Sequence, residues 1–100
     1  MEIKYTPELA NYIRKHNKKA LLVEMIELSN TDLEVTDLHP YFINKRMRDQ
    51  FVNKKQYRVF STELGEVLLP RFPLQTDETV IFGLKSILFF KQVTCQGIKV

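Results

Sequence analysis

The C-terminal segment most constrains how this chain can fold. Residues 79–100 are dense in β-branched and aromatic residues, and only Gly83 and Gly97 interrupt them. Such residues pack well on a pleated, half-buried surface. Gln96 and Gly97 add the signal of a turn or a bulge near the end of the segment. We therefore expect a core built mainly from β-strands.

Length and composition are typical of one globular domain. The chain has 100 residues, of which 44% are hydrophobic and 27% are charged, so we expect 1–100 to form a single domain. No apolar run reaches the length of about 18 residues that a membrane-spanning helix needs, and 1–7 lack the pattern of a signal peptide. A single cysteine excludes an internal disulfide. We therefore expect a cytoplasmic protein with no membrane partner.

The first third of the chain predicts a strand, a helix and a second strand. Alternating apolar residues at 3–5 favour a short strand. Thr6 can cap a helix over Pro7–His16, because threonine is a good N-cap and proline suits the first helical position. The apolar run Ala20–Leu28 predicts a central strand, and the polar residues 29–32 predict a turn after it.

The rest of the chain predicts a second helix and several strands. His39-Pro40 marks a boundary, since the residue before a proline avoids the helical region. From there an amphipathic helix is expected at about 40–52, with a basic outer face. Tyr57–Thr62 and Glu66–Leu69 read as a hairpin, and Thr79–Phe82 as a further strand. The periodicity of 85–93 does not separate helix from strand.

This order of elements predicts an α+β, β-rich fold. We expect one mostly antiparallel sheet that carries the strands at 20–28, 57–62, 66–69 and 79–82, with the N-terminal helix packed on it. The expected core consists of Ile3, Leu9, Ile13, Leu22, Val23, Ile26, Val59, Val67, Leu69, Ile81, Leu84, Leu88 and Phe89.

Several segments carry a resemblance to a known family. They are Ile3–Ile13, Ala20–Ile26, Tyr57–Phe60, Glu66–Leu69, Leu84–Val93 and Gly97–Val100, of which the Leu-Phe-Phe-Lys block at 88–91 is the most distinctive. In these segments the chain resembles a HesB-like domain, the fold of the A-type iron–sulfur carriers. It looks closest to the small HesB-related proteins with a vicinal cysteine or selenocysteine motif. The resemblance implies a HesB-like sheet over 1–28 and 57–100, and 33–56 is interpreted as an insertion.

The departures from that family bear on function. The relatives carry their cysteine pair just after the second strand, where this chain reads Ser29-Asn-Thr-Asp32. The carriers also end with two cysteines around a glycine, where this chain keeps Cys95 alone before Gly97. A cluster needs about four thiolates or substitutes, so we expect no iron–sulfur cofactor. Cys95 is more consistent with a small buried residue, and the alternative is a ligand shared across a homodimer.

Metal and catalytic sites have little support in the sequence. Asp37 and His39 could ligate a metal together with Asp32 or Glu34, but their spacing matches no known signature, and a turn residue is the simpler reading of His39. The chain has no Gly-x-Ser-x-Gly motif, and its three glycines are too sparse for a phosphate-binding loop. We therefore do not expect an enzyme.

Charge is distributed unevenly along the chain. Residues 24–37 contain five acids and no Lys or Arg, whereas 45–58 contain six bases and one acid. The bases of this second segment are Lys45, Arg46, Arg48, Lys54, Lys55 and Arg58, and a smaller basic cluster consists of Arg14, Lys15, Lys18 and Lys19. With Phe42, Phe51 and Tyr57 interleaved, the basic segment could bind phosphates while aromatic rings stack on bases. It could also be a solvated helix face, or lie against the acidic segment.

Three hypotheses for function follow. The leading one is a small cytoplasmic HesB-like domain without a cluster-binding site, which acts through contacts with another protein. The second is a nucleic-acid-binding module that uses the basic segment at 45–58. The third is an iron–sulfur or metal carrier in which two copies share Cys95.

Overall fold

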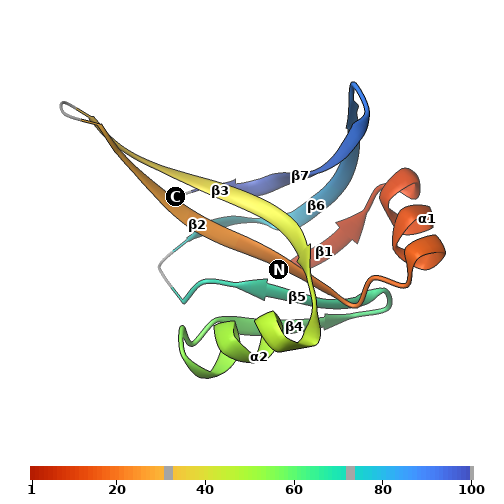
Figure 1. Cartoon of the computed structure of the whole chain (residues 1–100), viewed down its shortest axis with the longest axis horizontal. Coiled ribbons are helices and arrows are strands. Elements are labelled where there is room, and N and C mark those ends of the chain that lie inside the picture. Colours follow the sequence, from red (N-terminus) through yellow and green to blue (C-terminus); the bar gives the residue numbers. More distant parts are fainter. Residues whose placement is uncertain (31–32, 72–73, 100) are drawn as a thin grey trace.

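The computed structural model describes residues 1–30, 33–71 and 74–99, and for 27–30 and 33–37 it describes the backbone alone. The chain alternates strands with two helices (Figure 1). In order, the elements are β1 (Glu2–Tyr5), α1 (Pro7–His16), β2 (Ala20–Asn30), β3 (Leu33–Ile43), α2 (Lys45–Asn53), β4 (Arg58–Thr62), β5 (Gly65–Leu69), β6 (Gln75–Ile87) and β7 (Phe90–Lys99). This confirms the α+β, strand-rich class.

The strands form two sheets, both of them mixed. One has the order β1-β6-β7 and the other the order β3-β2-β5-β4. Each contains a parallel pair, β1 with β6 and β2 with β5, beside antiparallel pairs. The expectation of one shared sheet was therefore wrong, because β6 pairs with β1 and β7 and leaves β2, β4 and β5 to the second sheet.

The N-terminal helix forms as its caps predict. The Thr6 hydroxyl accepts a hydrogen bond from the Leu9 amide at 3.4 Å, and Pro7 takes the first turn. Asn17 ends the helix in a left-handed conformation with φ of 51°, which asparagine tolerates better than most residues. Leu9 and Ile13 are the buried residues of this helix, so the predicted inner face is confirmed.

The second helix begins later than predicted. Strand β3 continues through Pro40 to Ile43, and α2 starts at Lys45 behind the cap Asn44. Proline removes one donor from a strand, which is tolerated at a sheet edge, and β3 is an edge strand. Phe42 and Ile43 therefore belong to the strand. Residues 33–56, interpreted above as an insertion, form β3 and α2.

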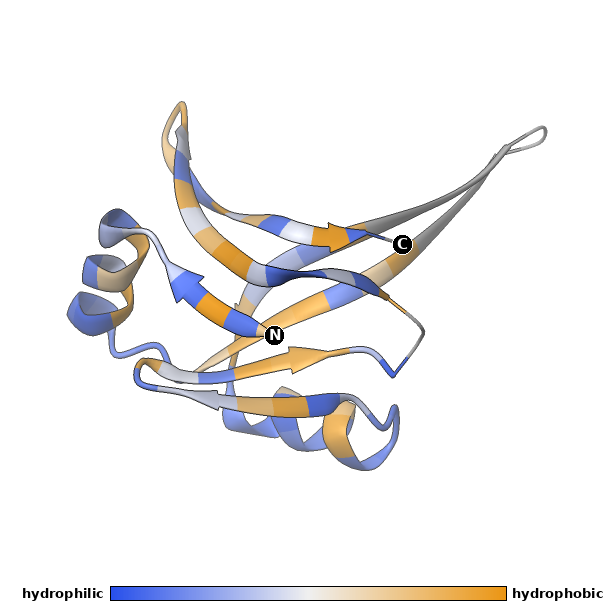
Figure 2. Ribbon diagram, turned by 180° about the vertical axis from the view of Figure 1, so that it is seen from behind, coloured by the Kyte–Doolittle hydropathy of each residue, from blue (hydrophilic) through white to orange (hydrophobic). Residues whose placement is uncertain are grey.

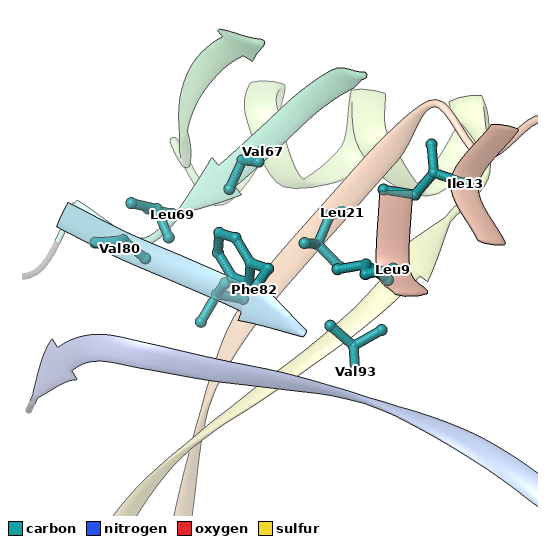
Figure 3. Packing of buried hydrophobic residues seen from close by; sticks show 9 residues of the cluster. Leu9, Ile13, Leu21, Val67, Leu69, Val80, Phe82 and Val93 are labelled. Atoms are coloured by element: carbon teal, nitrogen blue, oxygen red, sulfur yellow. The ribbon is translucent and has the colours of Figure 1, made fainter. Parts of the chain in front are cut away.

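The sheet containing β2 is covered on both faces. Leu21 and Val23 join a first core cluster between the two sheets and α1 (Figure 3). Ala20 and Leu22 point the other way, into a second cluster with Leu68 of β5 and Phe51 of α2. Because successive side chains in a strand alternate between faces, a strand buried on both sides needs a continuous apolar run. That explains the run at the start of β2.

Three residues of the predicted core are exposed. Leu88 and Phe89 are 90% and 104% exposed, because the β6–β7 turn falls on them, and Ile81 is 36% exposed on the outer face of its sheet. Leu9, Ile13, Leu22, Val23, Val67 and Leu69 are buried as predicted, and Ile3, Ile26, Val59 and Leu84 are half-buried. The turn was missed because it contains none of the usual turn residues.

One polar contact joins the two sheets. The Tyr5 hydroxyl of β1 lies 2.8 Å from the Thr62 hydroxyl of β4. Thr62 uses its single proton on the Gly65 carbonyl at 2.8 Å, so Tyr5 donates to Thr62. The Leu64 amide also donates to the Thr62 oxygen, at 3.2 Å. Thr62 thus fixes both the β4–β5 turn and its contact with β1.

Replacing Tyr5 with phenylalanine tests this inter-sheet contact. Tyr5→Phe removes one half-buried hydrogen bond, so we expect the free energy of unfolding to fall by about 1 kcal/mol in urea titrations. Tyr12→Phe is the matched control, because the described residues offer the Tyr12 hydroxyl no hydrogen bond. Equal effects of the two variants would show that the contact contributes nothing.

Candidate binding pocket between α1 and α2

Two basic segments far apart in the sequence meet at one hollow. Ala20 of β2 pairs with Ile43 of β3, so the start of one strand lies beside the end of the other and next to the start of α2 (Figure 1). The hollow has a volume of about 600 Å³. We call it the cationic pocket, and its lining residues are His16, Asn17, Lys18, Lys19, Ala20, Phe42, Ile43, Asn44, Lys45, Arg48, Asp49 and Glu66.

Local backbone bonds place the lysines at its rim. Behind the left-handed Asn17, the Lys18 amide donates to the Ile13 carbonyl at 3.0 Å. The Lys19 carbonyl accepts from the Glu66 amide at 2.9 Å, which ties this segment to β5. On the far side, Asn44 accepts from the Met47 amide at 2.9 Å and so fixes the start of α2.

Arg48 stabilises the pocket by pairing with the carboxylates of its lining. Its Nε and Nη2 donate to the two carboxylate oxygens of Glu66 at 3.0 and 3.1 Å, and its Nη1 donates to Asp49 at 3.2 Å. The bond to Glu66 is the main cause that raises the pKa of Arg48. This bidentate pair joins α2 to β5, which makes Arg48 a poor contact for a partner.

The other bases of the predicted surface are spread over α2 and β4. Lys45 lines the cationic pocket, and Arg46 is exposed beside it on α2. Lys54 caps the end of that helix. Lys55 lies 4.6 Å from the ring centre of Phe51, and Arg58 lies 5.6 Å from that of Phe60. The structure therefore brings only Lys45 and Arg48 of the six into the pocket.

The pocket keeps an excess of positive charge. Its two acids, Asp49 and Glu66, are both bound to Arg48, which leaves Lys18, Lys19 and Lys45 as the cations of the rim. The wall includes the buried Ala20 and the half-buried Phe42 and Ile43, and the lining among the described residues has no hydroxyl or thiol nucleophile. Such a site can hold an anionic group beside an apolar one.

The aromatic residues of the basic segment are not a stacking platform. Phe51 is 6% exposed and packs edge-on against Tyr57 with ring centres 5.0 Å apart. Phe42 is half-buried and stacks on Tyr12 at 6.0 Å. Stacking on bases needs an exposed ring face, so these rings contribute to packing instead.

The described residues show one contact between the acidic and basic segments, in which the Met25 amide donates to the Tyr57 hydroxyl at 3.5 Å. Glu24 is the one acid of the acidic segment with a described side chain, and it accepts a hydrogen bond from Tyr41. Burial and this bond to Glu24 raise the pKa of Tyr41. The side chains of Glu27, Asp32, Glu34 and Asp37 lie outside the described residues. The carboxylates that pair with Arg48 are those of Glu66, from β5, and of its neighbour Asp49.

Of the residues considered for a metal site, only His39 has a described side chain. His39 is exposed on β3, with its ring 5.1 Å from that of Tyr41, and the Asp37 side chain lies outside the description. Among the described side chains, no three of the metal-binding types gather at one place.

Cys95 lies on β7, opposite Phe82 of β6. It is half-buried and packs against the first core cluster. Burial raises the pKa of its thiol to about 11. One such thiol does not fit an iron–sulfur cluster, which needs several ionised ligands at one accessible place.

Comparisons with protein-family models, with curated proteins and with solved structures find no match for this chain. Neither helix of the described chain has the length and apolar character needed to cross a membrane.

The raised pKa of Cys95 predicts an inert thiol. The shift from 9.0 to about 11 lowers the thiolate fraction at pH 8 by roughly a hundredfold, and the thiolate is the reactive form. We expect Ellman's reagent to label native protein slowly and urea-unfolded protein within seconds. Labelling of the native protein within seconds would contradict the buried position and favour a ligand role for Cys95.

Proposed function

We propose that this chain is a HesB-like domain without cluster-binding cysteines, and that it binds an acidic segment of a partner protein in the cationic pocket. The observation that carries the proposal is the convergence of Lys18, Lys19 and Lys45 around a hollow of about 600 Å³. The acids of that hollow are already paired with Arg48, so the rim lysines can pair with carboxylates from outside.

The HesB-like part of the proposal is supported by the order of elements. The strand, helix and strand at 2–30 and the hairpins at 58–69 and 75–99 coincide with the segments that carry the resemblance. The hairpin β4–β5 is antiparallel, as the sequence predicts, and β6–β7 forms a second antiparallel hairpin. The single half-buried Cys95 supports a scaffold that no longer carries a cluster. A carrier would need ligands beyond two copies of Cys95.

The shape of the pocket favours a peptide over a nucleic acid. Phe42 and Ile43 line the hollow together with its lysines, which suits an acidic residue next to an aliphatic or aromatic one. Phe51 is buried and packs edge-on against the half-buried Tyr57, and Arg48 is held by Glu66. Nucleic-acid binding along α2 and β4 remains the second candidate, supported by the exposed Lys54, Lys55 and Arg58.

A peptide titration tests the proposed function. The probe is a fluorescently labelled peptide of alternating Glu and Leu, followed by anisotropy, with single-stranded DNA of equal charge as the competing ligand. We expect Lys18→Ser/Lys45→Ser to weaken peptide binding by about tenfold, because both cations leave the rim. Lys4→Ser/Lys99→Ser removes the same charge outside the pocket and should change the affinity by less than about twofold.

Two results would contradict the proposal. One is tighter binding of the DNA than of the peptide, with a loss of affinity in Lys54→Ser/Lys55→Ser, which would favour the nucleic-acid module. The other is equal weakening of peptide binding by the pocket variant and by its charge-matched control, which would show that net charge alone governs the contact.

A further inference from the structure

The hairpin of β6 and β7 ends in an exposed apolar turn. Ile87 pairs with Phe90, so Leu88 and Phe89 form the two-residue connection. Leu88 is 90%, Phe89 104% and Phe90 59% exposed. Figure 2 shows this end of the hairpin as hydrophobic and projecting from the molecule. We call Leu88, Phe89 and Phe90 the apolar tip.

Folding alone does not explain the residues of the apolar tip. Leu88 adopts a φ of 51°, a left-handed conformation that glycine or asparagine adopts at lower cost. Two-residue hairpin turns with a positive φ at the first central residue favour glycine there for this reason. A strained leucine beside a fully exposed phenylalanine raises the free energy of the isolated domain. Violations of this kind concentrate at functional sites.

Cations lie on both faces of the hairpin behind the tip. Lys91 pairs with Ser86 across the strands, and on the next rung Lys85 pairs with Gln92. Adjacent rungs point to opposite faces, so each face carries one lysine. Residues 79–100 contain no acid. The hairpin itself therefore presents cations without acids behind the tip, with Lys91 lying 5.8 Å from the ring of Tyr12 on α1, and this charge favours an anionic partner.

We propose that the apolar tip inserts into the surface of an anionic lipid bilayer, with Lys85 and Lys91 against the headgroups. Lys85 precedes Leu88 by three positions, which corresponds to roughly 10 Å of strand. Interfacial segments bury their apolar residues about 5–10 Å deep at the boundary of headgroups and acyl chains. The lysines then lie at the level of the anionic headgroups.

A bilayer fits this tip better than a second copy of the chain. A second copy would bring the same lysines and, in its own segment 79–100, no acid to pair with them, so the charge around the tip does not complement itself. The expectation of no membrane partner was based on the absence of a spanning segment. A surface contact through a turn requires none.

A tryptophan reporter gives a direct readout of insertion. The chain has no tryptophan, so Phe89→Trp places a single fluorophore at the tip. We expect its emission to shift to the blue with vesicles of phosphatidylcholine and phosphatidylserine in roughly a 7:3 ratio. Phosphatidylcholine vesicles should give a small shift, and added salt should reduce the shift seen with the mixed vesicles.

A turn variant separates binding from folding. Leu88→Gly/Phe89→Asn places glycine at the position of positive φ, so its melting temperature should equal or exceed that of the wild type. In co-sedimentation with the mixed vesicles, its affinity should fall about tenfold or more. Ile81→Thr is the matched control on the same strand, and it should sediment like the wild type. Lys85→Ser/Lys91→Ser should lose the preference for phosphatidylserine.

The same measurements can overturn the proposal. Absence of wild-type protein from both vesicle pellets would do so, as would undiminished sedimentation of the turn variant. Equal binding to phosphatidylcholine alone would remove the role of the anionic headgroups. A concentration-dependent dimer that the turn variant abolishes, without vesicle binding, would assign the tip to self-association.

Discussion

Burial of strand β2 on both of its faces is the constraint on which the rest of the structure depends. Leu21 and Val23 face the other sheet, while Ala20 and Leu22 face α2. β2 also pairs with β3 on one edge and with β5 on the other. A chain of 100 residues can bury only a small apolar surface. Because β2 contributes side chains to both clusters, the β1-β6-β7 sheet can pack on one face of its sheet and α2 on the other.

Both proposed binding surfaces lie at ends of elements that this core holds in place. The cationic pocket lies where β2 begins, and the apolar tip lies where β6 turns into β7. Aromatic rings connect the two. Lys91, behind the tip, lies 5.8 Å from the ring of Tyr12, which stacks on Phe42 at 6.0 Å, and Lys18 of the pocket lies 5.9 Å from Phe42. Both surfaces therefore carry lysines that an anionic partner can contact.

The sequence predicted correctly those elements whose structure depends on residues close together in the chain. Thr6, Pro7 and Asn17 define α1 through capping and backbone preference, and the alternation around Gly65 predicts the β4–β5 hairpin. Pro40 was misread as a helix start because its tolerance within β3 depends on that strand lying at a sheet edge. Leu88 and Phe89 were misassigned to the core because their hydrophobicity matches a strand and gives no sign of a turn.

The candidate pocket was predictable only in part. Lys45 and the cluster at Lys18 and Lys19 stand out as charge in the sequence, but their proximity comes from the pairing of Ala20 with Ile43. The partnership of Arg48 with Glu66 joins residues 18 positions apart in different elements, and no local pattern reports it. Composition therefore locates the cations, while the sheet register decides which of them form a site.

Native-state hydrogen exchange tests the central role of β2 most directly. The amides of Leu21, Leu22 and Val23 should exchange slowest, with opening free energies equal to the global free energy of unfolding from urea titration. The amides of the edge strand β4 should exchange through smaller openings. If Leu21–Val23 exchange as fast as Arg58–Thr62, β2 is not the most stable strand. It then cannot be the element that holds the cationic pocket and the apolar tip in place.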